Sequence, residues 1–148
     1  EVNVVELMKK TNAIIGGEGN GGIIYPELHY GRDSLVGVAL FLTYLAGQDK
    51  TVAQLRASYP QYYMSKNKIE LTPQIDVDAI LESLTGTYKN EQISTIDGVK
   101  IDFATEWVHL RKSNTEPIIR IYTEAPTQQE ADVLAERFVN ELKAIAGI

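Results

Sequence analysis

Two runs of alternating apolar and polar residues near the C-terminal end do most to restrict the possible folds. They are Trp107–Leu110 and Ile118–Tyr122, and a short polar segment separates them. Alternation with a period of two is typical of strands that bury one face. We therefore predict two strands joined by a polar connection, so that Arg111 and Arg120 face each other across the end of a hairpin.

The polar connection has the composition of a phosphate-binding loop. Its sequence, RKSNTEPIIR, puts a guanidinium group at each end and hydroxyl and amide side chains between them. A phosphate monoester carries a charge of about −2 near neutral pH, so a binding loop needs charged forks and several neutral donors. The predicted phosphate ligands are Arg111, Ser113, Asn114, Thr115 and Arg120. The alternative is a solvated loop in which Arg120 pairs with Glu116.

A glycine-rich segment near the other end of the chain is a second candidate site. Residues 16–22 read GGEGNGG and lie between two short apolar runs. Three of these glycines fit the dinucleotide-binding pattern, which requires a helix to begin directly after them. Residues 23–25 are apolar and Pro26 follows them, which predicts a strand stopped by proline. The pattern therefore disfavours a nucleotide site.

Both segments resemble loops of one enzyme family, the α-D-phosphohexomutases that act on glucosamine, mannose or glucose phosphates. The string R-x-S-N-T-E-P-x-x-R at 111–120 resembles the phosphate-binding loop of their last domain, and GEGNG at 17–21 resembles their sugar-binding loop. The resemblance implies that Glu18 accepts hydrogen bonds from two neighbouring ring hydroxyls and that Asn20 binds an adjacent oxygen. A carboxylate has the acceptor capacity for this. Some family members carry a histidine where this chain has Gly22, so the preferred sugar stays open.

The resemblance covers essentially the whole chain and implies two domains. Residues 1–60 are expected to be the C-terminal part of the third mutase domain, which has an α/β/α layer. Residues 61–148 are expected to form the small C-terminal α+β domain, an antiparallel sheet covered by helices.

The local signals agree with that order of elements. The strands are expected at Tyr62–Leu71, at Ile93–Ile96 and Val99–Phe103 around an Asp97-Gly98 turn, and on both sides of the arginine loop. The helices are expected near the N-terminus, from Asp33 to Ala46, from Thr51 to Tyr59, from Asp76 to Leu84 with Gly86 as its stop, and after Pro126. The helix that follows Asp33 is apolar around nearly its whole circumference, so we expect it to be buried on several sides.

For the intact enzyme, the resemblance implies a reversible shift of phosphate between the 1- and 6-positions of a hexose or hexosamine, through a phosphoserine and a bisphosphate intermediate. The family's serine motif, similar to Thr-Ala-Ser-His-Asn-Pro, and its Mg²⁺-binding Asp-Gly-Asp-Gly-Asp-Arg loop do not occur in this sequence. We therefore expect a C-terminal fragment that is inactive alone, with no catalytic residue and no Mg²⁺ ligand of its own. The alternative is a stand-alone, non-catalytic phosphosugar-binding module.

The composition of the chain limits the classes of molecule that it is expected to bind. A net charge of −6 argues against nucleic acid, because binding its phosphates requires a basic surface. The sequence has no cysteine, no apolar run of about 20 residues and no signal-peptide pattern, so we expect a cytoplasmic protein without membrane contact. The expected partners are a phosphorylated hexose or hexosamine and the N-terminal domains of the same polypeptide. The two histidines, His29 and His109, are too far apart in sequence to suggest zinc, and Arg32 is assigned no role.

Overall fold

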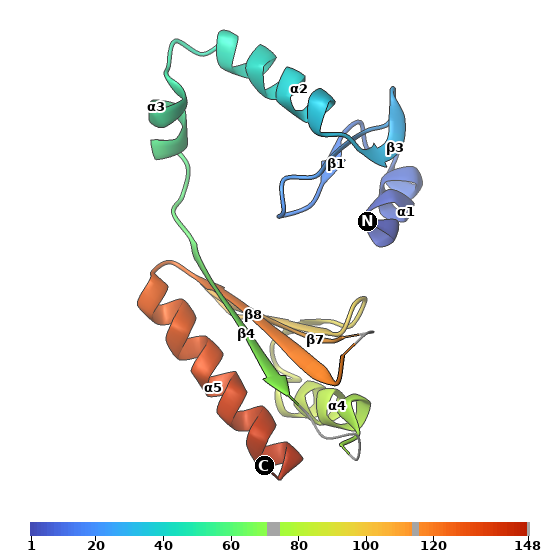
Figure 1. The fold of residues 1–148 in the computed structure, drawn as a ribbon, viewed down its shortest axis with the longest axis vertical. Helices are drawn as coiled ribbons and strands as arrows, with labels where there is room; N and C mark the ends of the chain where they lie inside the picture. The colour runs from blue at the N-terminus through green and yellow to red at the C-terminus, as the bar shows by residue number, and fades with distance from the viewer. Residues whose placement is uncertain (71–74, 114–115, 148) are drawn as a thin grey trace. The chain divides into compact units, whose positions relative to one another are not determined.

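The computed structural model describes residues 1–70, 75–113 and 116–147 and divides into two compact units, Glu1–Pro60 and Gln61–Ile148 (Figure 1). The expected ligands Asn114 and Thr115, and the expected strand end at Leu71, lie outside the described residues. None of the helices in the described part of the chain has the length and hydropathy needed to cross a bilayer.

The first unit combines three helices with a small antiparallel sheet. The sheet has three strands in the order β1-β2-β3, which are Gly16–Gly17, Ile23–Tyr25 and His29–Arg32. The helices are α1 (Val2–Thr11), α2 (Ser34–Ala46) and α3 (Val52–Ala57). A strand, β2, follows the glycine-rich segment, so the segment does not open a helix as a dinucleotide-binding loop must.

The helix starts of this unit follow their capping residues. Asp33 accepts hydrogen bonds from the amides of Leu35 and Val36 at 2.8 and 3.0 Å, which confirms it as the N-cap of α2. Thr51 and Gln54 form the expected capping box at the start of α3.

The expected burial of α2 is wrong for the part of the molecule that the structure describes. None of its described side chains is fully buried, and Leu35 is 81% exposed. Gly37 is in close contact with Ile23 of β2, so the helix packs on the small sheet there. Nothing among the described residues buries the remaining apolar circumference.

The second unit is a five-stranded antiparallel sheet in the order β4-β8-β7-β6-β5. The strands are β4 (Tyr63–Glu70), β5 (Gln92–Ser94), β6 (Val99–Asp102), β7 (Trp107–Lys112) and β8 (Ile118–Ala125). The helices are α4 (Val77–Thr87) and α5 (Gln128–Ala146), and α5 runs along β4 and β8 (Figure 1). The expected strands on both sides of the arginine loop are confirmed.

One face of this sheet and the two helices enclose the core. Alternate residues of β6, β7 and β8 point into it, as do the apolar faces of α4 and α5. Phe138 of α5 is fully buried and packs against the rings of Tyr88 and Phe103. Ile145, near the C-terminal end of α5, is 39% exposed. The opposite face of the sheet carries the arginines of the candidate phosphate loop together with Trp107, Tyr122 and Ile118.

Two local expectations in this unit need correction. Helix α4 continues to Thr87, so Gly86 lies inside it and does not stop it at Leu84. The extra turn is held by Tyr88, whose amide bonds to the Leu84 carbonyl and whose ring packs in the core. Asp97 and Gly98 do connect β5 to β6, but Ser94 pairs with Lys100, so the connection is longer than a two-residue turn. Of these two residues, Gly98 alone has a positive φ, 73°.

Candidate functional site

The two arginines of the predicted phosphate loop lie directly opposite each other. Arg111 on β7 and Arg120 on β8 are register partners, as the alternation predicted. Their neighbours Leu110 and Ile121 are fully buried in the core. Because side chains alternate between the faces of a strand, both guanidinium groups are directed to the other, helix-free face.

Each arginine is paired with a carboxylate of a neighbouring loop. Arg111 Nε lies 3.2 Å from Asp97 Oδ1, and Arg120 reaches Glu116 Oε2 at 3.9 Å. The side chains of the arginines are 47% and 42% exposed. Ion pairs this exposed contribute about 1 kcal/mol or less. The pairing of Arg120 with Glu116, named above as the alternative, is present, but its N–O distance is long. Because this ion pair is weak, a doubly charged ligand can replace it.

The backbone closes the loop between the two arginines. The Ser113 amide donates to the Ile118 carbonyl at 3.0 Å, and the Ile118 amide donates to the Glu116 carbonyl at 2.8 Å. Ser113 is the first residue after β7, and the first of these hydrogen bonds fixes its backbone at the start of the loop. Of the five predicted phosphate ligands, the structure describes Arg111, Ser113 and Arg120.

Sequence reasoning missed a third cation beside the two arginines. Lys68 on β4 is the register partner of Arg120, so Lys68, Arg120 and Arg111 form one row across three strands. Like charges directly opposite each other destabilise a sheet, which an anion bound over the row would offset. The Lys68 ammonium group lies 3.1 Å from Glu70 on the same exposed strand edge. The sequence does show that Lys68 is a basic residue in a predicted strand. It does not show that β4 pairs with β8, and this pairing is what brings Lys68 beside Arg120.

The glycine-rich turn of the first unit positions Glu18 and Asn20. The Glu18 amide donates to the Gly22 carbonyl at 3.0 Å, and the Gly21 amide donates to the Glu18 carbonyl at the same distance. Asn20 Oδ1 accepts from the Gly22 amide at 2.9 Å. Gly21 has a φ of 88°, which a residue with a side chain rarely adopts. The turn is thus closed by its own backbone, with two polar side chains on it.

The Glu18 carboxylate lies beside a positive charge. Its Oε2 is 3.4 Å from the Arg32 guanidinium, and that charge favours the ionised form of the carboxyl group. Glu18 is therefore a carboxylate near neutral pH and can only accept hydrogen bonds.

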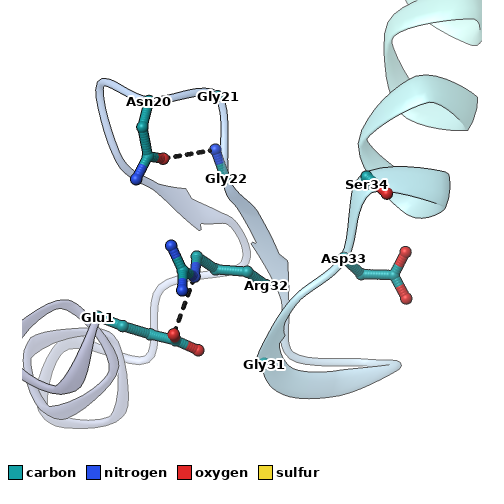
Figure 2. Close-up of a pocket in the computed structure, with 8 residues that line it drawn as sticks. All are labelled: Glu1, Asn20, Gly21, Gly22, Gly31, Arg32, Asp33 and Ser34. Atoms are coloured by element: carbon teal, nitrogen blue, oxygen red, sulfur yellow. Dashed lines mark hydrogen bonds and ion pairs between the residues drawn. The ribbon is translucent and has the colours of Figure 1, made fainter.

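Asn20 and Arg32 border a hollow of about 720 Å³ (Figure 2). One side of it is the turn Asn20–Gly22, and the other is the end of β3 with the start of α2, Gly31–Ser34. Figure 2 shows the Arg32 side chain between the turn and Glu1, and its Nε lies 2.8 Å from the Glu1 carboxylate. Arg32 is a residue of this site to which the sequence assigned no role.

Models of protein families match both units. Residues 1–63 match "Phosphoglucomutase/phosphomannomutase, alpha/beta/alpha domain III", and residues 48–141 match "Phosphoglucomutase/phosphomannomutase, C-terminal domain". The chain belongs to the phosphoglucomutase/phosphomannomutase family. The expected family and the expected fold class are confirmed.

Several curated members of the mutase family are similar over nearly the whole chain. A phosphoglucosamine/phosphogalactosamine mutase of Sulfurisphaera tokodaii is 39% identical over 97% of this chain, which spans 31% of that protein. A phosphoglucomutase/phosphomannomutase of Thermococcus kodakarensis is 37% identical over 86% of this chain and 28% of its own length. The chain therefore spans about a third of the mutases that it matches. A family structure from Burkholderia thailandensis shares the fold, with a TM-score of 0.71 over 95% of this chain and 30% of that one, at 23% identity.

The two histidines lie on strands β3 and β7 and make hydrogen bonds to residues of the same or neighbouring segments. His29 Nδ1 accepts from the Gly31 amide at 2.9 Å and its Nε2 lies 3.2 Å from Asp33 Oδ2, so it braces the start of α2. His109 Nε2 lies 2.5 Å from the carbonyl oxygen of Asp97. In the ranges that the structure describes, no three histidines or carboxylates are grouped to hold a metal ion.

Proposed function

We propose that this chain is the substrate-binding C-terminal part of a cytoplasmic mutase that interconverts the 1- and 6-phosphates of a hexose or hexosamine. The observation that carries the proposal is the pairing of Arg111 with Arg120 on one rung of the β7–β8 ladder, at the mouth of a loop rich in donors. Membership of the mutase family supports it, since the printed names of the relatives are those of sugar-phosphate mutases.

The proposed reaction moves a phosphoryl group without net gain or loss of phosphate. A phosphoserine in the rest of the polypeptide transfers its phosphoryl group to the free hydroxyl of the sugar monophosphate. The bisphosphate then reorients, and its other phosphoryl group returns to the serine. One phosphate is held while the other reacts, and in each orientation this chain supplies the grip on the phosphate that is not reacting.

The residues of this chain contribute positioning. Arg111 and Arg120 clasp the phosphate from two sides, Ser113, Asn114 and Thr115 donate to its oxygens, and Lys68 adds charge from the neighbouring strand. Glu18 accepts from ring hydroxyls and Asn20 binds an adjacent oxygen. Holding a substrate in a reactive geometry lowers a barrier by several kcal/mol. We assign Mg²⁺ to the rest of the polypeptide, because an aspartate loop resembling the family's metal site does not occur in this sequence.

The decisive experiment uses the full-length protein that contains this chain. It would be incubated with glucosamine, mannose or glucose 6-phosphate and a trace of the matching 1,6-bisphosphate, and 31P NMR would follow the 1-phosphate. We expect turnover of at least one sugar, and comparison of kcat/KM among the three identifies the substrate. We expect the 148-residue chain alone to bind without turnover. Binding without turnover by the full-length protein would favour the non-catalytic module instead.

The role of Glu18 has its own test. Because vicinal hydroxyls are common to these sugars, Glu18→Ala should lower kcat/KM by a similar factor for every sugar that the protein turns over. The loss of two charge-assisted hydrogen bonds corresponds to at least about 100-fold. Glu6→Ala, which removes an exposed carboxylate of α1, serves as the matched control and should leave kcat/KM unchanged. A loss confined to one epimer would contradict a contact to shared hydroxyls.

A further inference from the structure

Arg32 occupies space that a side chain at position 22 would need. A Cβ atom built on Gly22 would lie 2.7 Å from Arg32 Cδ and 3.2 Å from its Cγ. The backbone of Gly22 does not have the positive φ found at Gly21, so conformation is not the reason for a glycine there. The reason is room, because the aliphatic stem of Arg32 crosses the turn at this point.

The backbone of Arg32 is fixed from both sides. It is the last residue of β3 and the register partner of Ile24, which is fully buried. The next residue, Asp33, is the N-cap of α2, and its amide donates to the Ile23 carbonyl at 2.8 Å. The arginine therefore starts from a rigid position at the rim of the hollow (Figure 2).

The guanidinium group and Glu18 together suit a hydroxyl group. Arg32 carries only donors and the Glu18 carboxylate only acceptors, and the two approach to 3.4 Å. A hydroxyl group is both donor and acceptor, so one that binds beside this pair can donate to Glu18 and accept from Arg32. The Arg32 side chain is 46% exposed, so its present ion pairs are weak enough for a ligand to replace.

We propose that Arg32 is a substrate-binding residue that donates to a ring hydroxyl of the sugar, the same hydroxyl that donates to Glu18, and that Gly22 is needed to leave Arg32 its place. The proposal rests on the proposed function of the glycine-rich turn. It also gives a physical reason for the departure at Gly22, where some family members have a histidine, because in this chain the arginine stem fills that space.

A double-mutant cycle in the full-length protein tests the steric part. Arg32→Ala should lower kcat/KM by about 10- to 100-fold, the range for one charge-assisted hydrogen bond. Gly22→Ala should lower it about 10-fold alone, by displacing the arginine, and should cause no further loss in the Arg32→Ala background. Arg32→Lys should recover part of the loss, and Lys50→Ala, an exposed cation of the same unit, should cause none. Losses that multiply, or an Arg32→Ala change within twofold of the parent, would overturn the proposal.

Deoxy substrates test the contact itself. With the 3-deoxy and 4-deoxy forms of the hexose 1-phosphate that the parent turns over, the penalty of Arg32→Ala should vanish for the form that lacks the contacted hydroxyl. A structural role would leave the penalty the same for all substrates, as would a contact to the phosphoryl group, and either result would refute the assignment. Thermal unfolding of each variant checks the fold. Failure of the proposed function looks different, because then the parent protein turns over none of the three sugars.

Discussion

At the scale of single residues, the candidate phosphate site depends on one row of cations. Lys68, Arg120 and Arg111 are neighbours across three strands, and each is paired with a surface carboxylate. Such a row is unfavourable without an anion, and its pairs are exposed enough to be exchanged for phosphate oxygens. The row therefore makes specific predictions for its members.

The first prediction concerns the two adjacent cations at the end of β7. In the full-length enzyme, Arg111→Ala should lower kcat/KM by about two orders of magnitude, because the phosphate loses a charged, bidentate partner. Arg111→Lys keeps the charge but cannot bind the phosphate through two parallel N–H groups, so its kcat/KM should lie between those of the parent and Arg111→Ala. Lys112→Ala is the control, since its ammonium group pairs with Asp78 of α4 at 2.8 Å, away from the row. Equal rates for Arg111→Ala and the parent would show that this loop does not grip the phosphate.

The second prediction contrasts two glycines of the same unit. A Cβ at Gly98 would lie 2.2 Å from the Leu110 carbonyl oxygen, and its φ is 73°, so Gly98→Ala should destabilise the protein by at least about 2 kcal/mol. Gly86 lies in α4 with open space around it, so Gly86→Ala should stabilise by about 0.5–1 kcal/mol. Urea unfolding measures both. A Gly98→Ala variant as stable as the parent would show that the backbone at Leu110 and Arg111 leaves room for a side chain at position 98.

At the scale of secondary structure, side chains at the ends of the elements decide where most of them begin. Asp33 starts α2, Asp76 starts α4 and Thr127 starts α5, each by accepting one or two hydrogen bonds from amides in the first turn of its helix. These caps are readable from the sequence because they act within three residues. Helix α4 ends where tertiary packing of Tyr88 holds it, which no local pattern reveals.

The third prediction uses the titration of one cap. The amide of Val36 and the ring of His29 both bond to Asp33 and lower its pKa below the ordinary 3.8. The capping contribution is therefore fully present above the ordinary value and is lost as the pH falls through the lower pKa of the folded state. Amide hydrogen exchange at Leu35 and Val36 should accelerate accordingly, relative to residues at the middle of α2. Asp33→Asn keeps the cap without the charge and should remove this pH dependence, whereas a profile unchanged by the substitution would contradict the assignment.

The same distinction explains which parts of the site could be predicted. Alternation along β7 and β8 is local, so it placed Arg111 opposite Arg120 correctly. Lys68 joins them only through the pairing of β4 with β8, and strand order depends on the whole fold. Arg32 was missed because its contact with Gly22 spans a hairpin, and a glycine in a sequence does not reveal whether it serves conformation or space.

At the scale of the molecule, the two units differ in how much core they contain. Three of the 20 buried hydrophobic residues among those described, Met8, Ile24 and Leu55, belong to the first unit. The second unit holds the other 17, most of them in the core between its sheet and its two helices. The apolar surface of α2 stays open in the described chain, and side chains such as Leu35 and Leu42 are more than half exposed.

The fourth prediction follows from that asymmetry. In the 148-residue chain, the slowest amide exchange should fall in β6, β7 and β8 of the second unit, and α1 and α2 should exchange faster by orders of magnitude. Phe138→Ala should cost about 3–5 kcal/mol and accelerate exchange across the second unit while leaving α2 unaffected. Uniform protection of both units would show that they unfold together.

The strand order of the second unit has a consequence for biosynthesis. β4 is made first but finds its partner in β8, and their pairing runs from Tyr63 with Ala125 to Glu70 with Ile118. During translation, the ribosome must therefore release most of this unit before β4 can pair with β8. Until β8 is available, β4 exposes unpaired backbone amides and carbonyls. A premature stop codon before β8 would leave β4 unpaired in the truncated protein.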